Sequence, residues 1–528
     1  MNHVELFAGC GGLSLGLDKA GFDLVLANEL SPMAAETFAY NFFDEDFEDL
    51  ADKKQMPHKA IWLSSKFNEL KPRLRENPFE YPQLGGERIG FSDFKANEVD
   101  SLNGKLVVGS IVELNNLIES NSELKKLISG AFGRDGGLDL VSGGPPCQGF
   151  SMAGKREKDS DKNSLPWEFA RFVQNVKPKI VLLENVTGIL RAFKDEKGKQ
   201  FHAWYEVSKA FATIGYVPLC LHVNARHAGV AQNRPRFLMI ALRRDMLDKL
   251  EKQLPEKSFK LFEQSINFYQ QVQLSGGDIE FGHLDVIDTM AESGANLIKG
   301  TFLQHLYQCD EVSVREALDD LKTSDNVGKS SFVDKLNDTF SFLKPHPIDI
   351  NHGLRSNSEL VKRRFRIYQI LQELDSKSIT KDVFSVLKGT KQHIEPTTWE
   401  AIRESEFRCE KGELLKFSDK VELETYLKQH PTKKQTQKAL DPDLPAPAAL
   451  SIPDDACHYD PKELRVLTVR EMARIQSFPD NFVFRSKATT GGQMRKFEVP
   501  QYTQVGNAVP PLLALAVGNS IKELLQYK

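Results

Sequence analysis

Three segments of the chain combine tight turns with side chains that can do covalent or acid–base chemistry. The first, GGPPCQGFS at 143–151, follows the apolar run LDLVS and holds Cys147. Paired glycines and paired prolines predict a rigid, exposed turn, in which a thiolate can act as a nucleophile. A lone cysteine is more often a small buried apolar residue. The context of Cys147 therefore favours a catalytic role more than its residue type does.

The second segment carries a carboxyl group, and the third carries two guanidinium groups. Glu184 ends the apolar run IVLLE, whereas Arg234 and Arg236 precede and open the run FLMIAL. Ligands bind at the carboxyl ends of the strands in open α/β sheets, so Glu184 is expected beside Cys147. A helix cap at Glu184 and a surface pair of arginines remain the alternatives.

A glycine-rich turn near the start of the chain predicts a nucleoside-binding loop. The strand-like run His3–Phe7 leads into AGCGG and a helix, and Glu29 follows Gly9 by 20 residues. Glycines let the backbone approach a ligand closely, and an acidic residue at this spacing suits ribose hydroxyls. A tight turn without a ligand is the alternative, and these residues do not separate NAD from S-adenosylmethionine.

Apolar strand-like runs alternate with helical stretches up to about residue 245, which predicts an α/β fold with a mostly parallel sheet. About 13 residues without helical periodicity separate Val223 from Phe237. A parallel return needs a longer crossover, so the strand at Phe237 is predicted to be antiparallel. Its start, with Arg236, would then lie at the edge that holds Cys147 and Glu184.

The composition is that of an ordinary globular protein. The 528 residues include 69 Lys plus Arg and 73 Asp plus Glu, a formal net charge of −4. No apolar run approaches the roughly 20 residues needed to span a bilayer, and no signal peptide is expected. Six cysteines without a CxxC pair argue against a disulfide framework or a zinc ribbon. A reducing cytoplasm is the expected compartment.

The motifs of this chain, taken in order, resemble those of the DNA (cytosine-5) methyltransferase family. They are FAGCGGLSLG, NE, GGPPCQGFS, ENV, QNRPR, TVREMARIQSFPD and QVGNAVPP. The resemblance implies a Rossmann-like, S-adenosylmethionine-dependent domain with one antiparallel strand and an inserted mixed target-recognition domain. Residues 1–245, with an insertion at 41–104 expected to be helical or irregular, would form the catalytic domain. Residues 246–460 would form the recognition region, and 461–528 would return to the catalytic domain.

The family's chemistry assigns a role to each motif. Cys147 would add to C6 of a flipped cytosine in duplex DNA, and C5 would take a methyl group from S-adenosylmethionine. Glu184 would bind N3 and the exocyclic amine, Arg236 the base oxygen, and Arg234 would complete the catalytic group. The implied cofactor contacts are Phe7, Gly9, Gly11, Glu29, Ser110, Ile111, Pro146, Asn507, Ala508 and Val509. The expected DNA contacts are Gln148, Ser151, Gln232, Arg363 and Arg364, and no metal is expected.

The sequence departs from the family pattern in two places. The family often has Gly-Asp-Ile after the third strand, whereas here Ser110 replaces the Asp that touches the adenine amine. The insertion at 41–104 is also larger than a minimal member needs. Residues 351–440, which include Arg363 and Arg364, hold 18 Lys plus Arg against 13 Asp plus Glu. This basic segment is expected to contact DNA phosphates, with a solvated helix face as the alternative.

Three other functions compete with DNA methylation. One branch of the family methylates cytosine in tRNA, and the long recognition region favours DNA. A catalytically dead binding module is disfavoured because Cys147, Glu184 and Arg236 occur together. An NAD oxidoreductase would explain only the glycine-rich turn. A cytoplasmic enzyme, nucleoid-associated when bound to DNA, with a cognate restriction or defence system as its partner and no membrane contact, is the favoured hypothesis.

Overall fold

The computed structural model divides the chain into two compact units. It describes residues 1–84, 90–95, 98–146, 164–194, 200–308, 310–325, 327–433, 437–448 and 450–527. The first unit joins Met1–Asp310 to Phe482–Lys528, and the second spans Glu311–Asn481. Each unit has a core of its own and is described separately.

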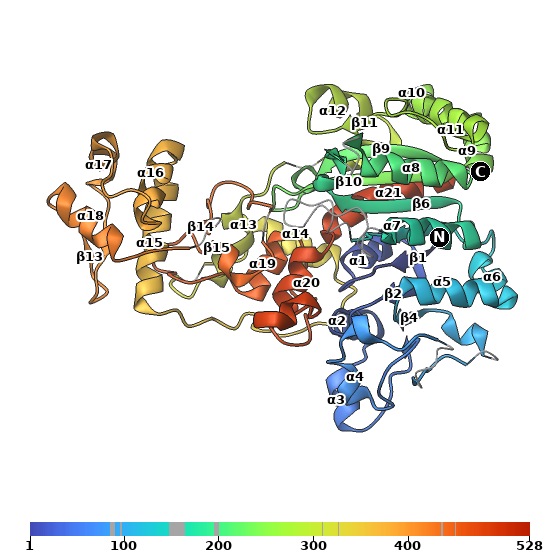
Figure 1. Cartoon of the computed structure of the whole chain (residues 1–528), viewed down its shortest axis with the longest axis horizontal. Coiled ribbons are helices and arrows are strands. Elements are labelled where there is room, and N and C mark those ends of the chain that lie inside the picture. The colour runs from blue at the N-terminus through green and yellow to red at the C-terminus, as the bar shows by residue number, and fades with distance from the viewer. Residues whose placement is uncertain are drawn as a thin grey trace. The chain divides into compact units, whose positions relative to one another are not determined.

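A nine-stranded sheet forms the centre of the first unit (Figure 1). Its order is β11-β9-β10-β6-β5-β1-β2-β4-β3, and β10 runs antiparallel to both of its neighbours, whereas the other pairs are parallel. The predicted α/β fold with one antiparallel strand is therefore confirmed. The strands are β1 (Asn2–Leu6), β2 (Asp23–Glu29), β3 (Ala60–Trp62), β4 (Lys105–Val108), β5 (Leu140–Gly143), β6 (Ile180–Val186), β9 (Tyr216–Asn224), β10 (Pro235–Arg243) and β11 (Val286–Asp288).

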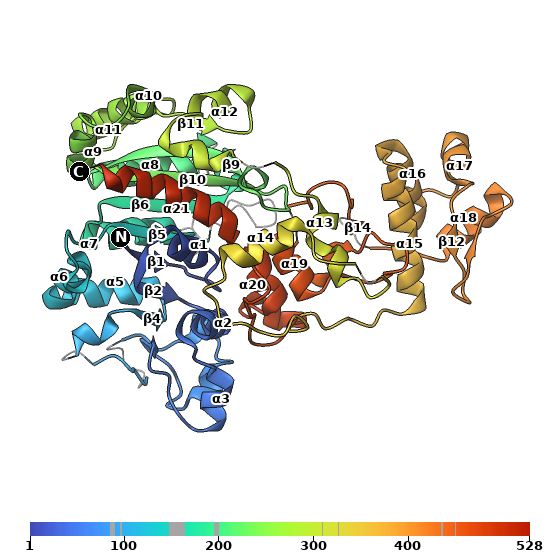
Figure 2. The same cartoon turned by 180° about the vertical axis from the view of Figure 1, so that it is seen from behind.

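Helices cover both faces of this sheet, because alternate side chains of each strand point to opposite faces. In β6, Val181 and Leu183 join the core beneath α5, α7 and α8, whereas Ile180 and Leu182 join the core beneath α1 and α21. Figures 1 and 2 show these two helical layers from opposite sides. The helices of this unit are α1 (Gly12–Ala20), α2 (Pro32–Phe43), α3 (Phe47–Asp52), α4 (Leu70–Arg73), α5 (Ile111–Ser120), α6 (Ser122–Ser129), α7 (Leu165–Val176), α8 (Ala203–Thr213), α9 (Arg244–Leu250), α10 (Glu256–Lys260), α11 (Glu263–Ser275), α12 (Glu292–Ile298), α20 (Gln501–Asn507) and α21 (Pro511–Gln526).

The first and last helices of the unit pack closely against each other. A Cβ atom on Gly16 of α1 would stand 2.4 Å from Cβ of Ala514 and 2.5 Å from the backbone nitrogen of Leu515 in α21. Likewise, a Cβ on Gly518 would stand 2.8 Å from Cβ of Ala20. Glycine at these two positions therefore lets the C-terminal segment pack against the N-terminal helix.

The insertion at 41–104 contains more order than predicted. It holds α3, α4 and the 3-10 turn η1 (Pro78–Glu80), but Ala60–Trp62 also forms β3, which extends the sheet beside β4. Asp93 accepts a hydrogen bond from the backbone nitrogen of Trp62 at 2.9 Å. It also forms an ion pair with Arg73, with 2.7 Å between Oδ2 and Nη1. A strand of three residues is too short to show an alternating pattern, which explains why the sequence did not reveal it.

The second unit is mainly helical, with two short ladders. Its core joins α15 and α16 through residues such as Tyr368 and Val383. Around α19, the Arg474 guanidinium pairs with Asp320 and, at 2.7 Å, with Asp480. The elements are α13 (Val314–Leu318), α14 (Ser331–Thr339), α15 (Glu359–Glu373), α16 (Lys377–Leu387), α17 (Pro396–Ile402), β12 (Phe407–Arg408), β13 (Leu414–Leu415), α18 (Lys420–Lys428), β14 (Lys438–Ala439), β15 (Ala456–Cys457) and α19 (Val469–Ile475).

The boundaries of the compact units differ from those predicted for the domains. Residues 246–310 belong to the first unit, because β11 pairs with β9 and α11 packs into the core of the sheet. Residues 461–481 belong to the second unit, where Arg465 and Arg474 form buried ion pairs. The second unit therefore begins about 65 residues after the predicted start of the recognition region, and it ends about 20 residues after the predicted end.

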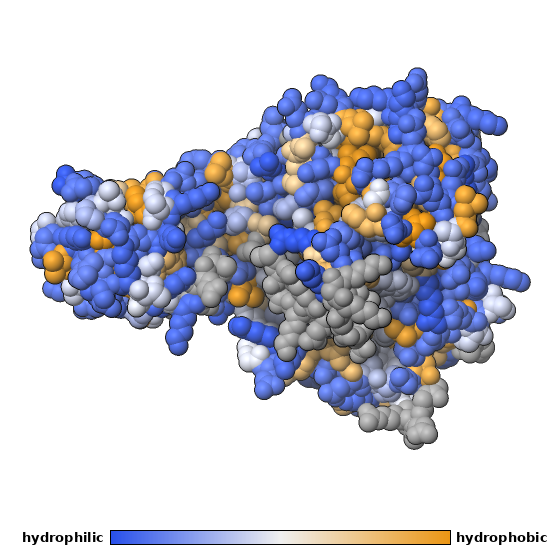
Figure 3. All heavy atoms as spheres, turned by 45° about the horizontal axis from the view of Figure 1, so that its top comes forward, coloured by the Kyte–Doolittle hydropathy of each residue, from blue (hydrophilic) through white to orange (hydrophobic). Residues whose placement is uncertain are grey.

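Hydrophilic residues cover most of the face shown in Figure 3, with separate apolar areas between them. Within the described ranges, no single helix is long and apolar enough to cross a membrane. One pair, Gly492–Asn507 and Pro511–Gln526, bent by 67°, meets the criteria of length and composition together.

Replacement of Gly16 by Ala is expected to lower the free energy of unfolding by about 1–3 kcal/mol, because the added methyl group overpacks the contact with α21. Chemical denaturation of the full chain measures this change. Lys19→Ala, an exposed change on the same helix, serves as the control. Equal stabilities of the two variants would contradict the close packing of α1 and α21.

Candidate active site

A cavity of about 570 Å³ opens at the carboxyl edge of the sheet in the first unit. Crevices of this kind are where open α/β sheets bind their ligands. The wall includes residues from the ends of β1, β2, β4, β5 and β6, from the start of β10 and from the segment 495–509. The predicted residues that line it are Phe7, Gly9, Glu29, Ser110, Ile111, Pro146, Glu184, Arg234, Arg236, Asn507, Ala508 and Val509.

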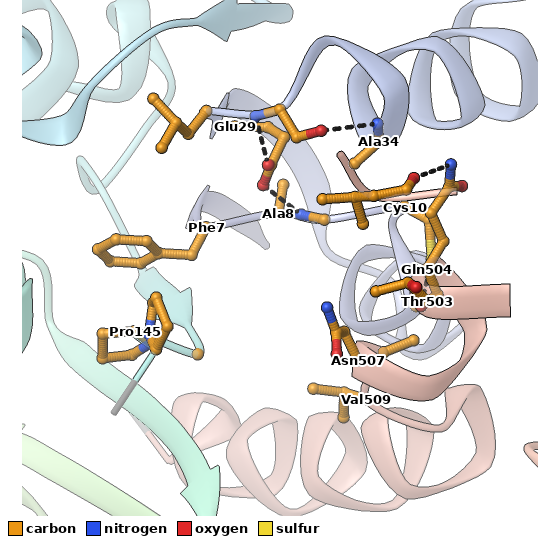
Figure 4. Close-up of a pocket in the computed structure, with 18 of the residues that line it drawn as sticks. Phe7, Ala8, Cys10, Glu29, Ala34, Pro145, Thr503, Gln504, Asn507 and Val509 are labelled. Carbon is orange, nitrogen blue, oxygen red and sulfur yellow. Dashed lines mark hydrogen bonds between the residues drawn. The ribbon is translucent and has the colours of Figure 1, made fainter. Parts of the chain in front are cut away.

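The glycine-rich loop adopts the left-handed backbone that its sequence favours. Gly9 and Gly11 have φ angles of 55° and 95°, and Phe7 also lies in this region at 56°. The Glu29 carboxylate accepts hydrogen bonds from the backbone nitrogens of Gly9 at 2.8 Å and Ser31 at 2.7 Å (Figure 4). Burial raises the pKa of Glu29, and these hydrogen bonds oppose the shift. Glu29 thus fixes the loop from the neighbouring strand.

Apolar and amide groups form much of the remaining wall. The Phe7 ring meets the ring of Phe169 edge-on, with 6.4 Å between their centroids. Figure 4 shows Phe7 beside Pro145, with Asn507 and Val509 at another part of the cavity. The cavity therefore has an apolar wall near the glycine-rich loop and an amide near the C-terminal segment.

Ser110 lines the cavity but also has a local structural task. Its hydroxyl accepts a hydrogen bond from the backbone nitrogen of Val112 at 3.2 Å and so caps α5. Such a cap stabilises a helix by about 1 kcal/mol. The next residue, Ile111, packs into the core beneath the sheet.

Glu184 and Arg236 form an ion pair, with 2.7 Å between Oε1 and Nε. The pairing of β10 with β6 sets Arg236 opposite Val186 and Leu238 opposite Glu184, so the two charged side chains are diagonal neighbours on one face. Burial lowers the pKa of Arg236, whereas the Glu184 carboxylate raises it. Both side chains are almost wholly buried, with exposed fractions of 11% and 9%.

Arg234, two residues before Arg236, binds the C-terminal segment. Its Nη2 donates hydrogen bonds to the backbone oxygens of Gly506 at 2.6 Å and Ala508 at 3.1 Å. Burial lowers its pKa well below the ordinary value, with Arg236 contributing in the same direction. Arg234 therefore positions the loop that carries Asn507 at the cavity wall.

The segment that leads to Cys147 is held at its start. Asn185 donates from Nδ2 to the backbone oxygen of Pro145 at 2.8 Å, and Pro146 lines the cavity. Cys147, Gln148 and Ser151 lie outside the described residues. Their predicted roles therefore rest on the sequence.

Three predicted DNA contacts are not among the residues that line the cavity. Gln232 is fully buried just before β10. Arg363 and Arg364 belong to α15 of the second unit. Arg363 lies 3.8 Å from a carboxylate oxygen of Glu410, and Arg364 donates to the backbone oxygen of Pro431 at 3.1 Å.

Sequence reasoning missed Gln504 as a central contact. Its Nε2 donates to the backbone oxygens of Met33 at 3.1 Å and Val499 at 3.0 Å, while its Oε1 accepts from Thr37 at 2.6 Å. It thereby ties α20 to α2. The sequence signal that could have indicated Gln504 was its position three residues before Asn507. Pro78, Phe79 and the run Arg495–Val499 also line the cavity, and no sequence pattern indicated this.

The chain is similar to known proteins over nearly its whole length. It matches the model of the family described as C-5 cytosine-specific DNA methylase over residues 1–64 and 84–523. The type II methyltransferase M.DdeI of Desulfomicrobium norvegicum is 26% identical over 522 residues, which cover 99% of this chain and 88% of the relative. M.Bpa9945I of Bacillus paralicheniformis is 26% identical over 552 residues, which cover 99% and 98%.

Among solved structures, one match is described as a DNA modification methyltransferase encoded within an E. coli prophage. The match has a TM-score of 0.44 and 21% sequence identity, and covers 99% of both chains. The family match extends over nearly the whole sequence, including every motif around the cavity. The chain therefore belongs to the C-5 cytosine-specific DNA methylase family and is a DNA (cytosine-5) methyltransferase.

Proposed function

We propose that the protein transfers a methyl group from S-adenosylmethionine to C5 of a flipped cytosine in a specific duplex DNA sequence. The observation that carries this proposal is a single cavity that holds both a nucleoside-type loop and the Glu184–Arg236 pair. One part of the cavity suits a nucleoside cofactor, and the other suits the polar edge of a base. The two parts would bring donor and acceptor together.

The residues of the wall fit S-adenosylmethionine. No atom lies within 4 Å of the position where a Cβ on Gly9 would stand, so the loop leaves open space for a ligand. Glu29, Phe7 and Asn507 would hold the ribose, the adenine and the methionine part. When bound, the cofactor supplies an electrophilic methyl group on its sulfonium sulfur.

In the proposed mechanism Cys147 is the nucleophile. Cytosine C5 is poorly nucleophilic, and attack of the thiolate on C6 would form an S–C6 bond and make C5 electron-rich. After C5 has taken the methyl group, transfer of the C5 proton to a base such as water would let the S–C6 bond break, which would release the thiolate and restore the aromatic ring. Covalent catalysis of this type divides one difficult step into easier ones.

Glu184 and Arg236 would orient the base and favour attack at C6. The Glu184 carboxylate would bind N3 and the exocyclic amine, and Arg236 would hold both the base oxygen and the carboxylate. A cytosine inside a duplex cannot reach a pocket of this kind, so the reaction requires base flipping. Exclusion of water from the cavity strengthens each of these polar contacts.

Replacement of Gly144 by Ala should lower kcat about 10- to 100-fold, because displacement of a catalytic group by about 1 Å costs up to this much. A Cβ atom at Gly144 would stand 2.9 Å from Oε2 of Glu184, which Arg236 holds in place. Steady-state methyl transfer at saturating DNA and S-adenosylmethionine measures the effect. Gly328→Ala, with no atom within 4 Å of its Cβ position, is the control. An unchanged kcat for Gly144→Ala would argue against the role of Glu184.

Covalent trapping tests the role of Cys147. Duplex DNA with 5-fluorocytosine at the target position should form a stable complex in the presence of S-adenosylmethionine, because the adduct cannot lose fluorine. Cys147→Ala should abolish the complex, seen as a shifted band on a denaturing gel. Cys409→Ala, a partly exposed cysteine of the second unit, should retain it. If Cys147→Ala formed as much of the complex as the unaltered protein, the proposed mechanism would be wrong.

The choice of DNA over RNA is tested directly. Methyl transfer from labelled S-adenosylmethionine should be seen with duplex DNA and not with tRNA. Activity on tRNA alone would overturn the proposed substrate. Sequencing of methylated positions in DNA from a host that expresses the chain would give the target sequence.

The basic helix α15 is proposed to contact DNA phosphates through Arg363 and Arg364. Removal of both side chains should weaken DNA binding similarly for all sequences and reduce the salt slope by about 1 per lost contact. Fluorescence anisotropy over a series of salt concentrations measures the slope. Lys19→Ala, at the end of α1 remote from the cavity, is the control. An unchanged slope in the double variant would exclude these contacts.

The biological setting is also part of the proposal. The relatives M.DdeI and M.Bpa9945I are named type II methyltransferases. By analogy, this protein would protect host DNA in a restriction–modification or phage-defence system, in the cytoplasm and at the nucleoid. A cognate nuclease would then recognise the same DNA sequence.

A further inference from the structure

The insertion at 41–104 reaches the cavity through Pro78 and Phe79. The Phe79 side chain is a large apolar group, yet 55% of its surface is exposed. Both residues belong to the 3-10 turn η1, and both line the cavity. An exposed aromatic ring at a cavity wall gains buried area when a flat ligand packs against it.

Polar contacts fix the backbone just before this turn and at its start. Asn77 caps it, with its Oδ1 accepting from the backbone nitrogen of Phe79 at 3.1 Å. The Glu76 carboxylate accepts from Ser65 Oγ at 2.5 Å and from the backbone nitrogen of Lys66 at 2.7 Å. The insertion therefore presents Phe79 from an ordered base.

The segment that carries Phe79 is linked to the end of the cavity that is formed by β2 and β4. The Tyr81 hydroxyl, two residues later, donates to the backbone oxygen of Leu30 at 3.4 Å, and Leu30 follows the last residue of β2. The sheet order β10-β6-β5-β1-β2-β4 sets this end three strands away from β6, which carries Glu184. If the base lies at Glu184, the nucleoside end of the cofactor extends toward β2 and β4.

Local hydrogen bonds already engage polar side chains near this end. Among the described residues of the wall the acidic ones are Glu5, Glu29, Glu184 and Glu498. Of these, Glu29 ends β2 but accepts two backbone hydrogen bonds with its two oxygens. Ser110, after β4, uses its hydroxyl to cap α5. An aromatic surface offers a further means of recognising a purine there that does not depend on these groups.

We propose that Phe79 packs its ring against the adenine of S-adenosylmethionine and sets the affinity of the cofactor from its nucleoside end. This inference rests on the proposed use of S-adenosylmethionine. It gives the insertion a function in the cofactor site. Phe79 and Phe7, contributed by different parts of the chain, would contact the same adenosine.

Isothermal titration calorimetry with S-adenosylhomocysteine tests this inference without turnover. Phe79→Ala should raise the Kd about 5- to 30-fold, the usual size of one lost aromatic–base contact. Phe79→Tyr, which keeps the ring, should stay within about threefold of the unaltered protein. Phe67→Ala removes a ring of similar exposure, 39%, from the same insertion outside the cavity wall and should have no effect.

A second ligand locates the contact. 5′-Methylthioadenosine lacks the amino-acid part, and its Kd should rise by the same factor in Phe79→Ala. A loss seen only with S-adenosylhomocysteine would assign Phe79 to the methionine part and overturn the inference. An unchanged Kd for both ligands would also overturn it, even if Phe79→Ala bound duplex DNA more weakly.

The outcome for the unaltered protein separates this inference from the proposed function. If the unaltered chain binds neither ligand, the proposed function itself fails. If it binds both and Phe79→Ala binds them equally well, only the role of Phe79 fails. Far-UV circular dichroism of Phe79→Ala and of Phe79→Leu confirms that a weaker affinity reflects the lost ring and not unfolding.

Discussion

The antiparallel direction of β10 is the constraint on which the Glu184–Arg236 end of the cavity depends. Because β10 runs against β6, its first residues meet the last residues of β6, and Arg236 reaches Glu184. Both groups are nearly buried, so each is the main compensation for the other's lost hydration. Removal of one partner from such a pair typically costs about 3–5 kcal/mol. A parallel β10 would carry Arg236 to the opposite edge of the sheet.

The two ends of the chain build the rest of the cavity together. Glycines at 16 and 518 let α21 pack against α1, and Gln504 joins α20 to α2. Arg234 then ties the loop before α21 to the start of β10 through two backbone oxygens. Contacts therefore connect the C-terminal segment both to α2 and to the strand that carries Arg236. The glycine-rich loop, the Glu184–Arg236 pair and this segment all line the same cavity.

The second unit has a separate source of stability. Arg474 lies between Asp480 and Asp320, and Arg465 lies between Glu471 and Glu463. Burial would raise the pKa of Asp480, but hydrogen bonds from Arg474 lower it to about 2. Charges of this kind must be fully paired to be tolerated in a core. They fix the helix α19 within the second unit, to which residues 461–481 belong.

The sequence by itself determined the α/β class, the reversed strand and most of the cavity wall. It could do so because glycine turns, apolar periodicity and charged strand ends are local patterns. Only the tertiary structure decided that Glu29 holds Gly9, that Arg234 binds the loop of Asn507, and that β3 extends the sheet. It also brought Phe79 to the cavity and set the limits of the two compact units. These features depend on contacts between residues far apart in the chain, and no local pattern encodes which distant groups will meet.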